Sequence, residues 1–588
     1  MRYALWIVLG YLLVLAGINF WQARKVKSQE DFMVAGRKLS LTTIVFTLIC
    51  TWIGSGTFIA GAEYAAKAGW SSLWLPAGAW VGIAIIYFLA GKIRTFGQFT
   101  VGDILETRYG AFARVFGAVC IVIAFTTIVS YQFRAGGYIL NIATDGAVSV
   151  EYGQMIAAGF VILFTALGGM VAVAHTDLPN GIIIVLACCA ALPFALLGAG
   201  GWDTAHQALP AGHMAAFDPS FGEYPVAKAL SYCLATMLLL MGIQSMYQKF
   251  YAAKSAKEAR RGAAIWIVGT IVVETVVVAI AIFAASKHWV EINEFETAAV
   301  VQKEVAADTT PVAQAGERLV QTLQEKQAAG RMSSAQAREV AGRLQADVGS
   351  CIEQNDKDCF VNARAGIDPR SIVLVAARDT VNRGGIGFLF GLLLLAAACA
   401  VVISTGMNYL LSPSTNIIRD ILGYGRVKQD QKRAVAMQKI FIVVLGLCAF
   451  AAIFIPTVLK SNISVLEYSL FAYTMYGVSI TPALLAALTW KRATPFGGTL
   501  SIVVGAFSAL VLKMILPRLA PEIMSGPDGD DIYGIPYIYP CLVLSVGSLI
   551  IGSLATSPPS KERLAKLFPD PGPRSPEPEA EGGRAAER

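Results

Sequence analysis

Charged residues are scarce in this chain. Only 15% of its 588 residues are Asp, Glu, Lys or Arg, whereas 55% are hydrophobic and the mean hydropathy is +0.58. A soluble globular domain carries nearer a quarter charged residues, so this composition excludes a disordered chain and argues against an ordinary soluble enzyme. The net charge of +7 comes from basic residues in short stretches between apolar runs. Membrane topology explains that pattern better than a nucleic-acid partner.

Motifs for metal-dependent and nucleotide-dependent chemistry are also missing. The four histidines are scattered, and no group of Cys and His has the spacing of a zinc site. No GxxxxGK[ST] sequence occurs, which argues against an ATP-driven pump. We therefore expect no enzyme activity, and energy for transport would come from an ion gradient.

Long apolar runs dominate the chain instead. A helix needs roughly 20 apolar residues to cross the ~30 Å hydrocarbon core, and about thirteen such runs predict an all-α membrane protein. The first run is too long for a signal peptide, and basic residues follow it rather than precede it, so we interpret it as a retained helix. The predicted spans are residues 3–22, 41–66, 70–91, 115–140, 154–174, 178–200, 226–247, 263–287, 385–411, 437–459, 463–489, 497–516 and 535–556.

The lysines and arginines indicate the orientation. They concentrate in the loops after odd-numbered spans, for example Arg24 and Lys25 after the first span and Lys249 and Lys254 after the seventh. The positive-inside rule then predicts an outer N-terminus and a cytoplasmic C-terminus. We expect a multi-pass protein of the plasma (inner) membrane, with the lipid bilayer as its surroundings.

Two regions are predicted to lie outside the membrane. Residues 289–384 form a long outer loop with helix-like stretches at 312–329 and 334–346, which predict a small helical hairpin. Cys351 and Cys359 follow it and either close a short disulfide loop or remain free thiols. Residues 557–588 are rich in Pro, Gly and Glu and are predicted to be a disordered cytoplasmic tail.

The second span contains helix-breaking residues in the middle of the membrane. Gly54 and Gly56 stand in the sequence Cys50-Thr-Trp-Ile-Gly-Ser-Gly-Thr-Phe58. An unwound turn here would free the carbonyls of Cys50 and Ile53 for a cation, because unpaired backbone in lipid must face a cavity or a ligand. The alternative is close helix packing through small residues.

Polar residues in two other spans point to the same chemistry. Ser404 and Thr405 offer neutral hydroxyl ligands to a hard cation such as sodium, unless they bond back to the preceding turn. Asp177, at the start of the sixth span, is costly in a membrane and therefore a functional candidate, unless it caps a helix together with Thr176.

Six short motifs occur in a consistent order along the chain and resemble those of the sodium/solute symporter family, whose members carry sugars, proline and sialic acid. The resemblance spans about residues 5–515 apart from the long outer loop. The matching stretches are Phe32–Arg37, Ile53–Phe58, Gly168-Gly169 with Thr176-Asp177, Gln248–Lys254, Ser404-Thr405 with Arg419-Asp420, and Trp490–Arg492.

The resemblance implies a five-plus-five inverted repeat of the leucine-transporter type. The expected parts are an extra N-terminal helix with an inner loop (1–40), the first repeat (41–200), the start of the second repeat (226–288), the outer insertion (289–384), the rest of the second repeat (385–489), two C-terminal helices (490–556) and the tail (557–588). It also implies a sodium ion held by the carbonyls of Cys50, Ile53 and Val401 and the hydroxyls of Ser404 and Thr405.

Some members bind a second sodium near the equivalents of Asp177 and Ser404 with two further hydroxyls. Here those two positions are Met407 and Asn408. Asn408 could offer an amide oxygen, but a thioether does not serve a hard cation, so we predict one sodium per cycle.

The substrate cavity is less defined. The sugar carriers use a tyrosine gate where this chain has Leu238–Leu240, which disfavours a sugar-type site. Arg134 could clasp a carboxylate or snorkel at the membrane edge, and Glu274 could pair with a cationic group, carry a proton or form a structural hydrogen bond. The cavity candidates are Thr57, Tyr131, Gln132, Arg134, Ser231, Thr236, Glu274, Tyr473 and Thr474.

We therefore expect a sodium-coupled secondary symporter that imports a small polar organic solute, such as an amino acid, organic acid or sugar-like compound, by alternating access. One alternative is a proton-coupled carrier of the same fold that uses Glu274 or Asp177. Another is a receptor-like solute sensor.

Overall fold

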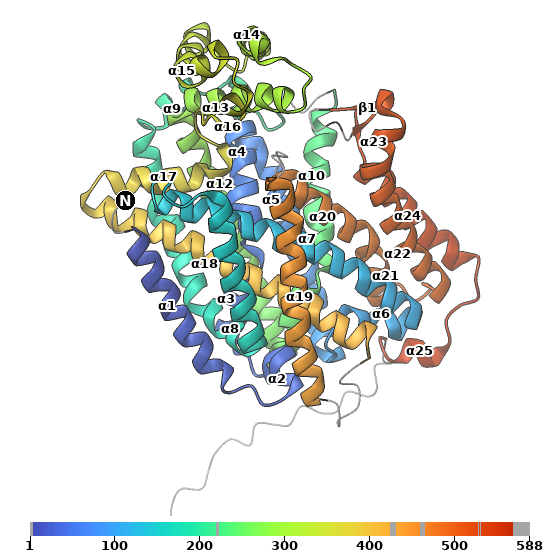
Figure 1. Ribbon diagram of the computed structural model, residues 1–588. Coiled ribbons are helices and arrows are strands. Elements are labelled where there is room, and N and C mark those ends of the chain that lie inside the picture. Colours follow the sequence, from blue (N-terminus) through green and yellow to red (C-terminus); the bar gives the residue numbers. More distant parts are fainter. Residues whose placement is uncertain are drawn as a thin grey trace, which may run out of the picture.

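The computed structural model describes residues 4–218, 223–423, 431–458, 465–526, 529 and 531–568. These residues form a helical bundle with one small antiparallel sheet of β1 (Met524–Ser525), β2 (Asp531–Ile532) and β3 (Ile535–Pro536), in that order (Figure 1). The architecture is that of the predicted all-α membrane protein.

The helices of the bundle alternate between long apolar segments and short connecting pieces. The longer or bundle-forming helices are α1 (Ala4–Ala23), α3 (Leu41–Trp52), α4 (Ala62–Ala68), α5 (Trp74–Phe96), α7 (Ala111–Ala143), α8 (Val150–Gly198), α10 (Pro225–Gly242), α11 (Gln244–Ala252), α12 (Ala256–Lys287), α18 (Gly385–Asn416), α19 (Gln431–Val458), α20 (Val465–Ser479), α21 (Thr481–Thr489), α22 (Pro495–Leu510) and α24 (Ile538–Leu554). The connecting helices are α2 (Gln29–Val34), α6 (Val101–Tyr109), α9 (Trp202–Ala208), α17 (Ile372–Asn382), α23 (Leu516–Leu519) and α25 (Lys561–Ala565).

The predicted number of thirteen spans is not confirmed. Within the described residues, nine helical segments are long and apolar enough to cross a membrane, and three further apolar helices are shorter. The number of predicted spans differs from the number of long helical segments because one observed helix can include two predicted spans, and one predicted span can be divided between two observed segments. The spans expected at 154–174 and 178–200 both fall in α8, and the break after α3 separates Leu41–Trp52 from the segment Gly56–Phe96.

Helix α8 turns at Gly169. A straight helix of its 49 residues would measure about 74 Å, more than twice the ~30 Å hydrocarbon core. Gly169 has φ 54° and ψ −153°, outside the helical range, and it lies directly against the ring and carbonyl of Phe32. The two halves of α8 are therefore distinct helical segments that meet at this glycine.

Helix α18 lies at the centre of the bundle. Its residues are buried along most of the length from Leu392 to Asn416, and it packs against both α7 and α8. A helix that is apolar on all sides and also carries Ser404, Thr405 and Asn408 must satisfy those polar groups within the bundle, because lipid cannot.

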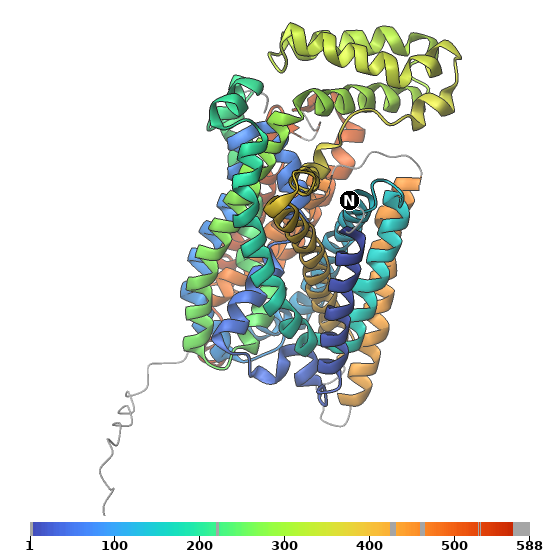
Figure 2. The same cartoon turned by 90° about the vertical axis from the view of Figure 1, so that its left-hand side faces the viewer.

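The segment between α12 and α17 forms a separate helical layer on one face of the bundle, which we call the insertion face. It consists of α13 (Trp289–Ala306), α14 (Val312–Ala328), α15 (Ser334–Glu353) and α16 (Lys357–Asn362), and Figure 2 shows these helices lying across the end of the bundle. They share a hydrophobic core of their own, and Cys351 is joined to Cys359 by a disulfide. The layer is thus larger than the hairpin expected from the sequence.

An ion pair within the insertion layer also feels a positive charge of the bundle. Glu296 on α13 pairs with Lys326 on α14 at 2.9 Å. Burial would raise the pKa of Glu296, but Lys326 and Lys67, the latter on α4, lower it to about 2. This carboxylate therefore stays ionised and joins the two parts of the molecule electrostatically.

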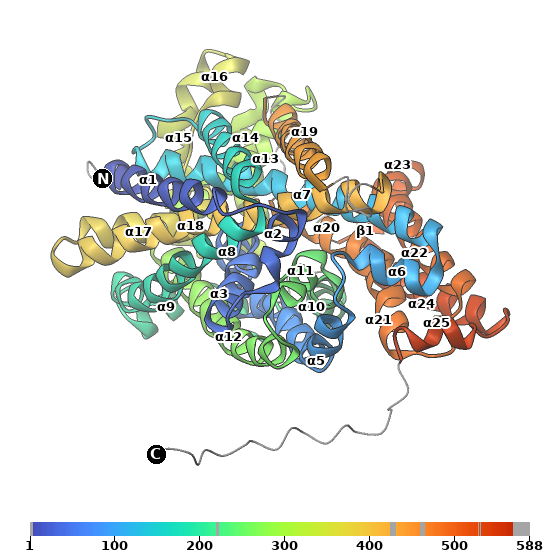
Figure 3. The ribbon, with the colours of Figure 1, turned by 90° about the horizontal axis from the view of Figure 1, so that it is seen from below.

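The chain ends lie at different faces of the bundle. Helix α1 begins near the insertion face and leads to α2 at the opposite face, where α25 also lies (Figures 1 and 3). Residues 557–588 were expected to form no core. Their described part contains α25 and the buried Leu567, and Phe568 lies under the ammonium of Lys92; residues 569–588 lie outside the described residues.

The turn in α8 yields a stability prediction. Gly169→Ala should lower the free energy of unfolding by about 1–3 kcal/mol or abolish folding, because a Cβ would lie 2.7 Å from the Phe32 ring at a positive φ. Gly159→Ala in the same helix is the matched control, since nothing lies within 4 Å of its added Cβ. We expect it to be neutral or stabilising by about 0.4–1 kcal/mol. Thermal unfolding in detergent would measure both, and equal midpoints for the two variants would contradict the turn.

Candidate functional site

Helix α3 breaks in the interior of the bundle. It ends at Trp52, Ile53 adopts an extended backbone (φ −71°, ψ 99°), and a π-helical turn over Gly56–Gly61 then leads into α4. The amide of Ser55 donates to the side-chain oxygen of Gln132 on α7 at 3.1 Å instead of to a backbone carbonyl. The backbone groups at the break are therefore satisfied by side chains of other helices, as the low dielectric of the interior requires.

The two glycines of the break allow close contact with other helices. A Cβ at Gly54 would lie 2.8 Å from the methyl of Thr405, and a Cβ at Gly56 would lie 2.5 Å from the hydroxyl of Tyr473. Both alternatives considered from the sequence are thus present together: the helix is unwound, and its small residues permit tight packing.

Hydroxyl and carbonyl oxygens of α3 and α18 meet at the break. The Thr405 hydroxyl donates to the carbonyls of Cys50 at 2.9 Å and Ile53 at 3.0 Å. The Ser404 hydroxyl lies 3.3 Å from the Cys50 carbonyl and donates to the Asp177 carboxylate at 2.7 Å. Val401 is buried on α18 one turn before Thr405, and within the described chain no contact of its carbonyl with this cluster is recorded.

This group of oxygens is suited to a hard monovalent cation. Two carbonyls, two hydroxyls and a neighbouring carboxylate are all oxygen donors, and Ser404 and Thr405 are at most 2% exposed. Hard cations prefer such ligands, and the carbonyls at a broken helix are free to turn toward an ion.

Asp177 is the central acid of the site. Its side chain is fully buried and receives hydrogen bonds from Thr47 on α3, Ser404, and the amide nitrogen of Asn408 at 3.2 Å. It lies eight residues after the turn at Gly169, inside the second half of α8 rather than at a helix start, so it does not cap a helix. Thr47 was missed in the sequence, although it lies one turn before Cys50 on the same helix.

Lys249 was also missed as a site residue. The sequence places it in a cytoplasmic loop, but the structure shows it fully buried on α11, with its ammonium bonded to the amide oxygen of Asn408 and 3.1 Å from the sulfur of Met170. The Asn408 amide therefore lies between the positive charge of Lys249 and the negative charge of Asp177. The position of Lys249 next to Gln248, within a matching motif, was the only available signal.

The candidate cavity residues divide into separate groups. Thr57, Thr236, Glu274 and Tyr473 line one cavity beside the break, together with Trp52, Gly56 and Ser72. Tyr131 reaches this group through its hydroxyl, 3.3 Å from that of Tyr473.

The remaining candidates lie elsewhere. Gln132 supports the break, whereas Ser231 and Thr474 line a different cavity with Lys228 and Asp531. Arg134 lies near the Tyr138 ring, 5.6 Å from its centre, and does not line the cavity of Glu274.

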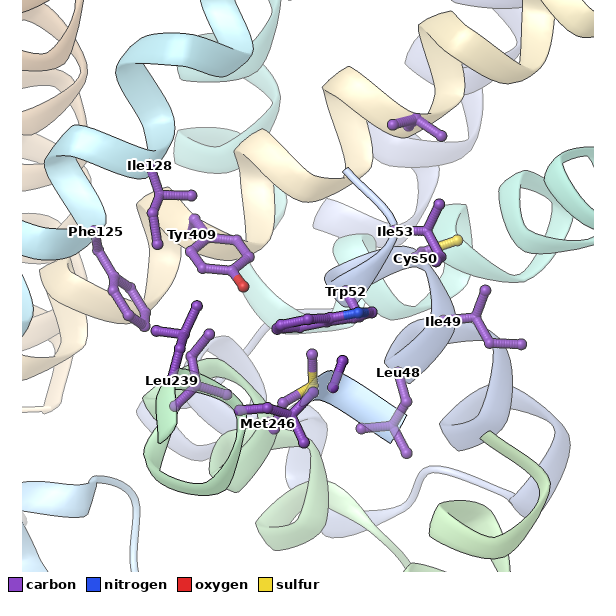
Figure 4. Close-up of a cluster of buried hydrophobic side chains, with 14 of the residues drawn as sticks. Leu48, Ile49, Cys50, Trp52, Ile53, Phe125, Ile128, Leu239, Met246 and Tyr409 are labelled. Atoms are coloured by element: carbon purple, nitrogen blue, oxygen red, sulfur yellow. The ribbon is translucent and has the colours of Figure 1, made fainter. Parts of the chain in front are cut away.

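Trp52 connects the cation cluster to the cavity. Its ring lies among Tyr409, Leu239 and Met246, on the other side of the α3 terminus from Cys50 and Ile53 (Figure 4). Its indole N–H donates to Glu274 at 2.9 Å, and Trp80 of α5 donates to the other oxygen of the same carboxylate at 2.8 Å. Neither tryptophan was identified from the sequence, because their apolar bodies make them indistinguishable from core residues there.

Comparisons with known proteins identify the family to which this chain is similar. The model of the sodium:solute symporter family matches residues 32–365 and 380–505. A sodium/proline symporter of Staphylococcus aureus is 23% identical over 576 residues, covering 93% of this chain and 92% of that protein. The osmoregulated proline transporter OpuE of Bacillus subtilis (strain 168) is 23% identical over 570 residues, covering 94% of each chain.

A solved structure shows the same fold. A Na⁺-coupled sialic acid symporter in a substrate-bound outward-open state superposes with a TM-score of 0.67 at 15% identity, covering 94% of this chain and 98% of the other. This likeness confirms the predicted fold class of a leucine-transporter-type carrier.

The contact at Gly56 yields a prediction about the break. Gly56→Ala should cost about 1–3 kcal/mol of stability, because its methyl would collide with the Tyr473 hydroxyl. Adding Tyr473→Phe removes that oxygen and should recover most of the loss. Thermal midpoints of the single and double variants test this; a double variant no more stable than Gly56→Ala alone would contradict the contact.

Proposed function

This chain belongs to the sodium:solute symporter family, and we propose that it is a sodium-coupled secondary symporter that imports a small polar organic solute by alternating access. The observation that carries the proposal is the contact of Ser404 and Thr405 with the carbonyls at the α3 break. These atoms come from two helices far apart in the sequence, so an ion between them would hold α3 and α18 together.

The proposed sodium ligands are the carbonyls of Cys50, Ile53 and Val401 and the hydroxyls of Ser404 and Thr405. Each hydroxyl would turn its lone pairs toward the ion and release the carbonyl it now contacts. Sodium bound in this way favours one arrangement of α3 against α18, which we take to be the outward-open state. The membrane potential contributes ~2.3 kcal/mol per charge per 100 mV to the free energy that drives the sodium ion into the cell.

We further propose one sodium per cycle. The Asn408 amide oxygen, the best remaining ligand for a second ion, accepts a hydrogen bond from Lys249, and Met407 offers only sulfur. The fixed ammonium of Lys249 lies in the same network as Asp177 and supplies the positive charge that a second sodium would bring. A further cation beside it would be repelled.

For orientation, we propose that the insertion face is extracytoplasmic. Basic residues gather at the opposite face, where Arg114 pairs with Asp420 at 2.9 Å, Arg108 donates to the carbonyls of Trp490 and Lys491, and Arg37 to that of Gln98. That distribution follows the positive-inside rule, with the N-terminus outside and the C-terminus cytoplasmic.

Sodium binding can be tested without knowledge of the solute. We expect NaCl to raise the thermal midpoint of the purified protein above that in KCl of equal ionic strength, because a ligand that binds only the folded state stabilises it. Thr405→Val keeps the side-chain shape but loses the hydroxyl, so it should need at least about tenfold more sodium for the same shift. Thr165→Val is the matched control, since the buried Thr165 hydroxyl donates to the Val161 carbonyl of its own helix and to no other group among the described residues.

Transport itself is tested in proteoliposomes with labelled L-proline, L-alanine, D-glucose and succinate. We expect uptake of one of these solute classes under an inward sodium gradient. Uptake that is unchanged when potassium replaces sodium contradicts the coupling, and uptake driven by pH alone favours the proton-coupled carrier.

The stoichiometry is tested at Lys249. Lys249→Met removes the ammonium and leaves Asp177 without its positive neighbour, so a second sodium should enter and the Hill coefficient for sodium should rise from about 1 toward about 2. Lys249→Arg retains the charge and should keep a coefficient of about 1. A coefficient near 1 in a folded Lys249→Met protein would contradict this role.

A further inference from the structure

Glu274 is a buried acid in the cavity beside the α3 break. It lies on α12, is 3% exposed, and shares the cavity with Trp52, Thr57, Thr236 and Tyr473. The sodium cluster does not involve it, so the proposed coupling ion leaves its function unexplained.

The partners of Glu274 hold its carboxylate in one orientation. One oxygen accepts the indole N–H of Trp52 at 2.9 Å, and the other accepts that of Trp80 at 2.8 Å. The Thr57 hydroxyl is a third neighbour of the same group. Neutral N–H donors aimed at both oxygens stabilise the ionised carboxylate, because a protonated oxygen would be a poorer acceptor, whereas burial in the apolar interior opposes ionisation.

When it is ionised, Glu274 has no counter-ion in the part of the chain that the structure describes. No lysine, arginine or histidine lines its cavity, and none forms an ion pair with it there. A buried charge is costly unless it is paired, and hydrogen bonds from neutral groups compensate only part of that cost. The cavity is therefore complementary to a positive charge brought by a ligand.

The cavity walls fit such a ligand. Trp52 and Tyr473 provide aromatic rings, whose faces attract cations, and Thr57 and Thr236 provide neutral hydroxyls. Arg134, which would have supplied a second charge for a zwitterion, does not reach this cavity.

We propose that this cavity binds the ammonium group of the transported solute, with Glu274 as its counter-ion and Trp52 and Tyr473 as its aromatic walls. The inference rests on the proposed function, because it assigns the solute of that same carrier to the amines, including amino acids and quaternary ammonium compounds. A proton on Glu274 is the competing way to neutralise the site, and the experiment separates the two.

The test uses pairs of probes that differ only in the charged nitrogen. They are L-alanine with L-lactate, L-proline with tetrahydrofuroate, and choline with dimethylbutanol. Each is added at saturating sodium to the purified full chain, and the thermal midpoint is measured. We expect at least one amine to stabilise the protein with an apparent affinity at least tenfold higher than that of its partner lacking nitrogen.

Variants at Glu274 assign the effect to this carboxylate. Glu274→Gln should lose the amine response by tenfold or more and keep the sodium-dependent shift, which also shows that the variant is folded. Glu294→Gln is the matched control, because Glu294 is equally buried but lies on α13 in the insertion layer. It should respond to sodium and to the amine as the unmodified protein does.

Each other outcome overturns the inference. It fails if no amine in the panel shifts the midpoint, if the partners lacking nitrogen bind as tightly, or if Glu274→Gln keeps the amine response. It also fails if Glu274→Gln abolishes a pH-driven uptake that needs no amine, because Glu274 is then the proton carrier. A sodium-dependent shift that persists in any of these cases leaves the proposed sodium coupling intact, so the two failures are distinguishable.

Discussion

The structure depends on how the broken end of α3 is satisfied. In a bilayer, a backbone group without a partner costs several kcal/mol, so a helix can break there only where other parts of the protein supply the missing bonds. Thr405 of α18 supplies them to the carbonyls of Cys50 and Ile53, and Gln132 of α7 supplies one to the amide of Ser55. The packing of α3, α7 and α18 at this point is therefore a condition of the break, and the ion site is formed by the same atoms.

Two buried charge systems lie on the two sides of this break. On one side, Asp177 and Lys249 are of opposite sign and are joined through the Asn408 amide, so their charges compensate each other. On the other side, the donors that the described residues present to Glu274 are neutral. A compensated pair is typical of a permanent structural element, whereas an uncompensated charge next to a cavity is typical of a site that is completed by a ligand. The contrast explains why we assign the solute to the Glu274 side, whereas the ion is assigned by the contacts of Ser404 and Thr405 with the α3 carbonyls.

The sequence indicated where α3 breaks and which hydroxyls face the break, although it left close packing and bonding to the preceding turn open, and the sodium ligands came from the family resemblance. Gly54 and Gly56 are unusual in an apolar helix, and Ser404 and Thr405 are the adjacent hydroxyls of the ninth span, so local chemistry identified them. Lys249 and Trp80 were not predicted as site residues. Apolar periodicity indicates which side chains are buried, but it does not indicate which neighbouring helix each of them contacts. Arg134 and Glu274 show the same limit: both lie in apolar spans, but only the fold shows that they are in different places. The number of spans stays a prediction, because a single glycine divides α8 into two helical segments.

The adjacency of Trp52 and Ile53 gives the coupling a physical route. The Ile53 carbonyl belongs to the cation cluster and the Trp52 indole to the Glu274 cavity, so consecutive residues at the end of α3 contact the two sites. An ion that fixes the Ile53 carbonyl also restricts the backbone that carries Trp52, and a solute that fixes Trp52 restricts the carbonyl in turn. Coupling between sites is reciprocal by thermodynamic necessity, and a pair of consecutive residues at an unwound turn is a short physical connection through which it can act. A continuous helix would fix both residues by its own hydrogen bonds and leave neither site able to influence the other.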